Sequence, residues 1–241
     1  FLSVKKHFSV GSWLKLVKSR INLCVKKNKI PIIVGGTGLY FNGITKGISS
    51  IPEIKNKTRN LVRNLHKKLG QIKFYEKLIF IDPLSKNKIV PTDTQRTIRA
   101  YEVKVATKKS LYEWSSFTKP EFLNYDIKKI YLNIPRGKLL KNISARTEEM
   151  FQNGCIDEVK NFQTLNIDKS LSANKLIGLR EISNYLRGKT TLEDTKDMIN
   201  IRTRQYAKKQ NTWSRGHMKN WTKLYSKDLT ILIKKVSKVI S

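Results

Sequence analysis

Metal-ligating residues are few in this sequence of 241 residues, which has two cysteines and three histidines. Cys24 and Cys155 are far apart, and His7, His66 and His217 are scattered without the spacing of a zinc site. We therefore expect neither a metal site built from protein ligands nor a disulfide. Each cysteine is interpreted as a small, buried apolar residue.

Long hydrophobic runs are also absent. No apolar stretch approaches the roughly 20 residues that cross a bilayer, and the lysines near the N-terminus are not followed by the apolar core of a signal peptide. These absences predict a cytoplasmic protein without a membrane partner. With 39% hydrophobic residues, the chain can still bury the core of one large domain or two small ones.

Acidic residues are scarce, because 18 Asp and Glu stand against 49 Lys and Arg and leave a formal charge of +31. Such a charge attracts polyanions over a long range and favours a nucleic-acid partner. The alternative is a compositional bias, since lysine far outnumbers arginine. The positions of the arginines are therefore more informative than the total charge.

A complete phosphate-binding loop, G-x-x-x-x-G-K-[ST], is missing. The nearest match ends in Gly188-Lys189-Thr190, but Ser183 stands at the first glycine position and a helical pattern, not a strand, precedes it. We interpret Gly188 as the residue that ends a helix. The chain also begins with Phe1 and not with Met, which suggests a lost preceding segment.

Apolar periodicity predicts a helix over residues 9–28, and the apolar run of residues 30–36 is typical of a parallel strand buried on both faces. Helices are expected across residues 46–128, one of them capped by Thr92 or Asp93. A second strand is predicted over residues 129–134.

A long helix is expected after Pro135, ended by Gly154 in the left-handed conformation, with further helices near 156–163, 175–187 and 191–215. The order of elements predicts an α/β fold. Its core would comprise residues 1–45 and 129–241, and residues 46–128 would form a helical insertion domain.

The turn Gly35-Gly36-Thr37 lies between the predicted strand and the next helix. Glycines there allow a ligand to approach the backbone, free amides at a helix start favour an anion, and the threonine hydroxyl can donate to an oxygen. A tight turn without a ligand fits the same pattern. The residues alone leave both interpretations open.

Basic residues at helical spacing mark two further segments. In residues 202–216, one helix face carries Arg204, Lys208, Asn211 and Arg215, while Tyr206 and Trp213 lie on another face and are expected to pack into a core. In residues 95–99, Arg96 and Arg99 are neighbours on a helix beside Gln95. Arginine can grip phosphate with two parallel hydrogen bonds, which favours function over a solvated surface.

Four segments, in order, resemble the tRNA dimethylallyltransferase family and cover nearly the whole chain: VGGTGLYF, PTDTQRTIRAYEV, RTEEMFQNGCIDEVKNF and IGLREISNYLRGKTTLEDTKDMINIRTRQYAKKQNTWSRG. The resemblance implies a P-loop NTPase-like parallel sheet with flanking helices, plus a helical insertion domain that contacts tRNA. The family's first strand, phosphate-binding loop and general-base aspartate have no counterpart in these residues. A zinc-binding C-terminal extension is absent too, as in bacterial or organellar members.

The activity that the resemblance implies is transfer of a dimethylallyl group from dimethylallyl diphosphate to N6 of adenosine 37, beside the tRNA anticodon. Mg2+ would be bound with the diphosphate, and the other partner is the anticodon stem-loop of tRNA. We expect a monomer, and we expect these 241 residues alone to be inactive. Two alternatives are an adenylate isopentenyltransferase acting on free nucleotide and a noncatalytic RNA-binding chain.

By position in these motifs, Thr37 and Arg180 would be the catalytic residues: Thr37 would contact the tRNA near the target base, and Arg180 would lie near the diphosphate and bind it. Gly38 occupies a variable position of the turn and receives no specific role. The tRNA contacts implied by the resemblance are Thr37, Arg59, Gln95, Arg96, Thr97, Ile98, Arg99, Lys208, Lys209, Gln210 and Arg215.

Overall fold

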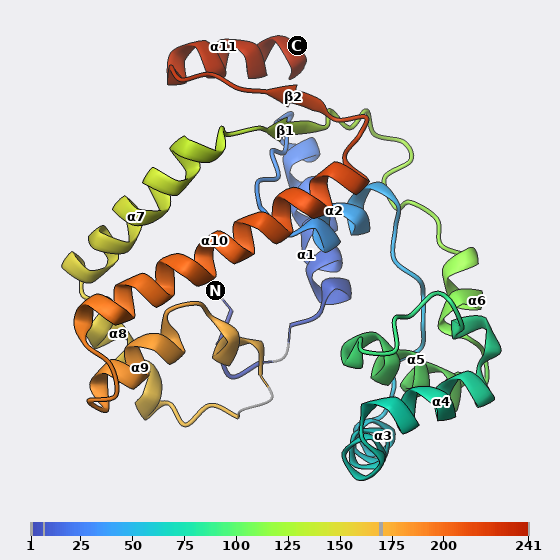
Figure 1. The fold of residues 1–241 in the computed structure, drawn as a ribbon. Coiled ribbons are helices and arrows are strands. Elements are labelled where there is room, and N and C mark those ends of the chain that lie inside the picture. Colours follow the sequence, from blue (N-terminus) through green and yellow to red (C-terminus); the bar gives the residue numbers. More distant parts are fainter. Residues whose placement is uncertain (1, 7, 169–170, 241) are drawn as a thin grey trace. The chain divides into compact units, whose positions relative to one another are not determined.

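The structure is a computed structural model that describes residues 2–6, 8–168 and 171–240 (Figure 1). The chain divides into two compact units. The first, which we call the terminal unit, consists of Phe1–Gly38 and Tyr125–Ser241, and the second, the middle unit, consists of Leu39–Asn124. Both are mostly helical, and the described residues contain two short parallel strands.

The middle unit is a small helical bundle, as the apolar spacing of its sequence predicts. Val62, Phe74, Leu78 and Tyr101 belong to its buried core, where α3, α4 and α5 pack against one another. The helix that begins at the boundary between the units is α2 (Gly38–Thr45). The remaining elements are α3 (Asn56–Leu69), α4 (Gln71–Ile81), the 3-10 turn η1 (Pro83–Ser85), α5 (Thr94–Thr107) and α6 (Leu111–Ser116).

Asp82 is the polar centre of the middle unit and is 1% exposed. Its Oδ2 atom accepts hydrogen bonds from the hydroxyls of Ser85 and Ser110, each at 2.9 Å. Ser110 also caps α6, because its hydroxyl accepts from the backbone N–H of Tyr112 and its own N–H donates to the Glu113 carboxylate. One carboxylate therefore ties the end of α4 to the start of α6.

We expect Asp82→Ala to lower the free energy of unfolding by about 2–4 kcal/mol, because it leaves two buried hydroxyls without their acceptor. Urea unfolding followed by circular dichroism measures the change. Glu76→Ala is the matched control, since Glu76 is an exposed carboxylate of α4 and its loss should cost less than about 0.5 kcal/mol. Equal unfolding midpoints for the two variants would contradict the prediction.

The terminal unit has a core in which Cys155, Val159, Ile182 and Ile199 are buried together, and α10 packs against α7 and α9. Its two strands pair in parallel, with Ile130 opposite Thr222. The elements are α1 (Val10–Lys26), β1 (Ile130–Leu132), α7 (Arg136–Gln152), α8 (Cys155–Thr164), the 3-10 turn η2 (Ser172–Lys175), α9 (Leu179–Leu186), α10 (Leu192–His217), β2 (Thr222–Leu224) and α11 (Leu229–Ile240).

The strand predicted for residues 30–36 is not formed. This segment is extended but unpaired, and Ile30, Ile32 and Val34 are 70%, 71% and 87% exposed. A strand needs a neighbour to accept and donate its backbone hydrogen bonds. Within the described residues the sheet consists of β1 and β2, and neither pairs with this segment. The prediction of a doubly buried strand is therefore wrong for this structure.

Several local predictions are confirmed by the backbone. Gly154 follows α7 with φ of 85°, and Gly188 follows α9 with φ of 68°, so both end helices in the left-handed region and Gly188 belongs to no phosphate loop. Asp93, one of the two expected caps, accepts from the Arg96 N–H at the start of α5. Cys155 is buried as expected, but Cys24 is only half-buried.

Candidate functional site

The turn at residues 35–37 meets the last part of α10 within the terminal unit. Gly35, Gly36 and Thr37 are all exposed, and α2 begins directly after them. The Nε2 atom of Gln210 donates a hydrogen bond to the Gly36 carbonyl at 3.0 Å. The fold therefore brings together two predicted site residues, Thr37 and Gln210, from opposite ends of the sequence.

The approach of α10 to this turn is close on both sides of Thr37. A Cβ atom on Gly36 would lie 2.3 Å from Gln210 Nε2, and a Cβ atom on Gly38 would lie 2.3 Å from the Trp213 ring. Trp213 in turn stacks on His217, with ring centroids 4.4 Å apart. Gly38 therefore packs closely against Trp213 of α10, a contact that the sequence did not reveal.

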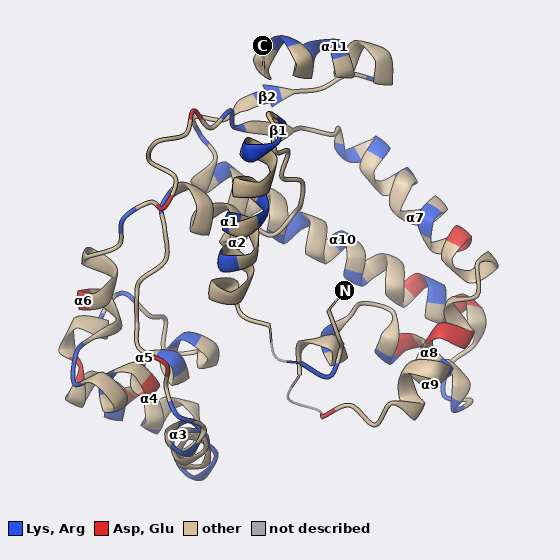
Figure 2. Cartoon of the chain, turned by 180° about the vertical axis from the view of Figure 1, so that it is seen from behind, with Lys and Arg blue, Asp and Glu red and all other residues tan. Residues whose placement is uncertain are grey.

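The basic stripe predicted for residues 202–216 lies on α10. Arg204, Lys208 and Arg215 are exposed and Asn211 is half-buried, and Lys209 beside them is exposed too. Figure 2 shows lysines and arginines along α10. The expected packing of Tyr206 into a core is wrong, because this ring lies on the outer side of the helix and is 46% exposed.

A second basic site lies in the middle unit, where Arg63 of α3 and Arg99 of α5 flank Glu102 and Arg59 of α3 lies within electrostatic reach of Arg99. We call these three arginines the arginine cluster. Glu102 is 3% exposed, and its carboxylate oxygens lie 3.7 Å from Arg63 Nε and 3.7 Å from a terminal nitrogen of Arg99. Arg59 Nε donates to the Ile54 carbonyl at 3.1 Å.

The arginine cluster carries more positive charge than Glu102 can neutralise. Burial lowers the pKa of Arg99, the Glu102 carboxylate raises it and the Arg59 guanidinium lowers it further, so Arg99 lies within electrostatic reach of both groups. The side chains of Arg63 and Arg99 are 49% and 40% exposed, and can therefore donate hydrogen bonds to an outside anion.

Arg63 was missed by the sequence interpretation. The signal was available, because Arg59 and Arg63 are four residues apart on a predicted helix in a chain that otherwise favours lysine. The sequence alone could not show that Glu102 of α5 is buried and forms ion pairs with an arginine on each of the two helices. The ion pairs of Glu102 with Arg63 and Arg99 hold the cluster across α3 and α5.

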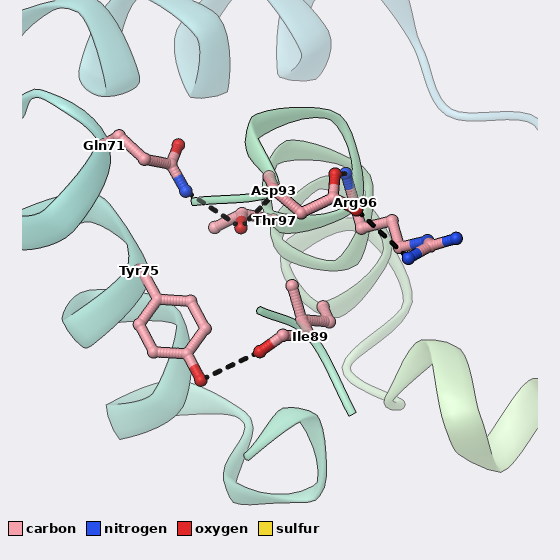
Figure 3. A network of polar contacts seen from close by, with 6 residues as sticks. All are labelled: Gln71, Tyr75, Ile89, Asp93, Arg96 and Thr97. Atoms are coloured by element: carbon pink, nitrogen blue, oxygen red, sulfur yellow. Dashed lines mark hydrogen bonds and ion pairs between the residues drawn. The ribbon is translucent and has the colours of Figure 1, made fainter. Parts of the chain in front are cut away.

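The start of α5 is organised by Asp93 and Gln71 (Figure 3). Arg96 forms an ion pair with Asp93 at 3.1 Å and points outward, with its side chain 69% exposed. Thr97 is fully buried. Its hydroxyl is satisfied within the protein, because it donates to the Asp93 carbonyl at 2.7 Å and accepts from the Gln71 side chain at 3.2 Å. The Thr97 side chain therefore faces the core, and its hydroxyl is not available to an outside ligand in this structure.

The other two residues of this segment differ in their surroundings. Gln95 is exposed, whereas Ile98 is partly buried and packs against the core of the middle unit. The accessible side chains of segment 95–99 are therefore those of Gln95, Arg96 and, in part, Arg99.

Arg180 is exposed in the first turn of α9, and its neighbour Glu181 is buried against Arg202 at 2.8 Å. No hydrogen bond or ion pair among the described residues joins Arg180 to the turn at Thr37. The two residues assigned to the reaction are thus not linked directly in this structure.

The described part of the chain contains no group of three His, Cys, Asp or Glu side chains that could hold a metal ion. None of its helices is both long and apolar enough to cross a membrane.

Comparison with known proteins gives consistent matches. The model of the family described as IPP transferase matches residues 1–217. The chain is 48% identical over 238 residues to the tRNA dimethylallyltransferase of Pelagibacter ubique, covering 99% of this chain and 76% of that protein. It is 40% identical over 221 residues to the tRNA dimethylallyltransferase of Rickettsia massiliae, covering 91% of this chain and 61% of that protein.

A solved structure extends the likeness to the fold. The tRNA isopentenylpyrophosphate transferase of Bacillus halodurans matches with a TM-score of 0.65 and 28% identity, covering 99% of this chain and 75% of that chain. The arrangement of helices and short parallel strands described above is therefore shared with that enzyme.

Proposed function

The chain belongs to the IPP transferase family, and from this membership we propose that the protein transfers a dimethylallyl group from dimethylallyl diphosphate to N6 of adenosine 37 in tRNA. In this reaction a bond forms between N6 and the allylic carbon, and the bond from that carbon to the diphosphate oxygen breaks. The electron pair leaves with the diphosphate, and N6 gives up a proton. The observation that carries the proposal is the family match over residues 1–217.

We propose that Thr37 contacts the tRNA near the target base. Its support is the exposed turn at the start of α2, where the hydroxyl is accessible and the backbone is held by α10. Arg180 would oppose the charge that develops on the diphosphate, since its exposed guanidinium lies on the same unit. β1 and β2 would belong to a P-loop NTPase-like parallel sheet.

Two basic surfaces support tRNA as the substrate. One is formed by Lys208, Lys209 and Arg215 of α10, and the other is the arginine cluster with Gln95 and Arg96 beside it. Positively charged side chains at these places would bind phosphates of the anticodon stem-loop. An enzyme acting on free adenylate has less need of such surfaces, which disfavours that alternative.

Mg2+ would enter with the substrate. The ion would be held mainly by oxygens of the diphosphate, because Mg2+ in such sites takes few ligands from the protein. When bound, it would neutralise part of the charge of the leaving group.

The test of the proposed function uses the full-length protein, dimethylallyl diphosphate and unmodified tRNA. We expect isopentenyladenosine at position 37, detected by mass spectrometry of the digested tRNA. Absence of this product from every tRNA that has adenosine at position 37 would sink the proposal. Strong competition by AMP against tRNA would instead favour the free-nucleotide enzyme.

We expect Arg63→Ala to weaken tRNA binding about fivefold and to reduce the slope of log affinity against log salt by about 1, because one phosphate contact is lost. Filter binding at several salt concentrations measures both quantities. Lys77→Ala removes the same charge from an exposed position of α4 and serves as the matched control. If both variants weaken binding equally, the arginine cluster is not a specific contact.

A further inference from the structure

Gln210 lies in a basic, exposed segment of α10, but its side chain forms a hydrogen bond with the protein backbone. It is half-buried, and its Nε2 atom donates to the Gly36 carbonyl at 3.0 Å. Within the described residues, this is the hydrogen bond that joins residues 31–37 to another element. The segment before it pairs with no strand, so this hydrogen bond is an important tie between the turn and α10.

The carbonyl that accepts this hydrogen bond belongs to the peptide group between Gly36 and Thr37. A peptide group is planar, so fixing the Gly36 carbonyl also fixes the N–H of Thr37 in the same plane. The Gln210 amide fills the space where a Cβ of residue 36 would be, at 2.3 Å from Nε2. Glycine at this position therefore allows α10 to approach the backbone, and glutamine supplies a donor of the right length.

Trp213 acts on the other side of Thr37. Its ring lies where a Cβ of Gly38 would be, and it stacks on His217 with an angle of 1° between the ring planes. Residues three apart on a helix share a face, so Gln210 and Trp213 reach the turn together. The two side chains bracket Thr37 by contacting the glycines before and after it.

We propose that Gln210 is a positioning residue that holds the turn at residues 35–37 and thereby places the Thr37 hydroxyl for the reaction, with Trp213 as the second support. This inference rests on the proposed function. It separates Gln210 from Lys208, Lys209 and Arg215, whose exposed charges point to a direct contact with RNA. A positioning residue changes the rate of the bound complex, whereas a phosphate contact changes the affinity.

The experiment compares Gln210→Ala with Lys209→Ala in the full-length protein. We expect Gln210→Ala to lower kcat about 10- to 100-fold, because a misplaced group of this kind has effects of that order, while the KM for tRNA and the salt dependence stay within about twofold. Lys209→Ala should raise the KM and lower the salt slope by about 1. A loss for Gln210→Ala that lies in KM and salt slope would overturn the inference.

Gln210→Glu is the second variant, since it keeps the shape of the side chain and removes the donor. It should match Gln210→Ala in kcat, and wild-type kcat for Gln210→Glu would overturn the inference even if the alanine variant folds poorly. The double variant with Thr37→Ala should fall no more than about twofold below Thr37→Ala alone, because both changes act through one group. Additive losses would also overturn it. An inactive wild-type enzyme would instead refute the proposed function.

Discussion

The 241-residue chain, produced without further residues, is expected to bind tRNA with a steep salt dependence and to transfer no dimethylallyl group. The sequence contains no G-x-x-x-x-G-K-[ST] motif to hold the diphosphate. The cations proposed to contact phosphate are nevertheless present: Arg59, Arg63, Arg99, Lys208, Lys209 and Arg215. We therefore expect this chain to retain tRNA binding while it lacks catalysis.

The expected size of the salt effect follows from counterion release. A protein that makes about six phosphate contacts loses roughly a thousandfold in affinity between about 50 and 200 mM salt. Filter binding measures this loss, and radiolabelled dimethylallyl diphosphate measures transfer to tRNA. The tRNA dimethylallyltransferase of Pelagibacter ubique, assayed in parallel, is the control that shows the tRNA is a competent substrate. Transfer of label by the 241-residue chain above the protein-free background would contradict the prediction.

The helices could be predicted from the sequence because their causes are local. Apolar residues at a spacing of three or four define the buried faces, Asp93 caps α5, and Gly154 and Gly188 adopt the left-handed backbone after α7 and α9. The apolar run of residues 30–36 was misleading. Its side chains are typical of a strand, but pairing depends on a distant neighbour that no local pattern reports.

In the candidate site too, features with local causes could be predicted, whereas contacts between distant parts of the sequence could not. Exposure of Thr37 and of the α10 cations follows from glycine pattern and helical periodicity. Burial of Thr97 could have been predicted too, because it precedes the buried Ala100 and Tyr101 by three and four residues on α5. The bond from Gln210 to Gly36 could not, since it joins residues 174 apart in the sequence.

Replacing Gly36 with alanine is expected to reduce kcat about 100-fold, because the new Cβ would displace the Gln210 amide and move the turn that carries Thr37. The physical reason is the distance of 2.3 Å between that Cβ position and Gln210 Nε2. Gly35→Ala is the matched control, since a Cβ there meets no described atom within 4 Å and the same loss of backbone freedom occurs. Steady-state kinetics of the full-length enzyme, with thermal unfolding of each variant, give the comparison.

A background lacking the Gln210 side chain shows whether this contact is the cause. Once Gln210→Ala has emptied the space beside residue 36, adding Gly36→Ala should lower kcat by less than about threefold, because the two changes then disrupt the same interaction. If Gly36→Ala costs as much in that background as it does alone, its effect arises from strain in the turn itself. Equal losses for Gly35→Ala and Gly36→Ala would lead to the same conclusion. In that case the contact with α10 would not be what positions Thr37.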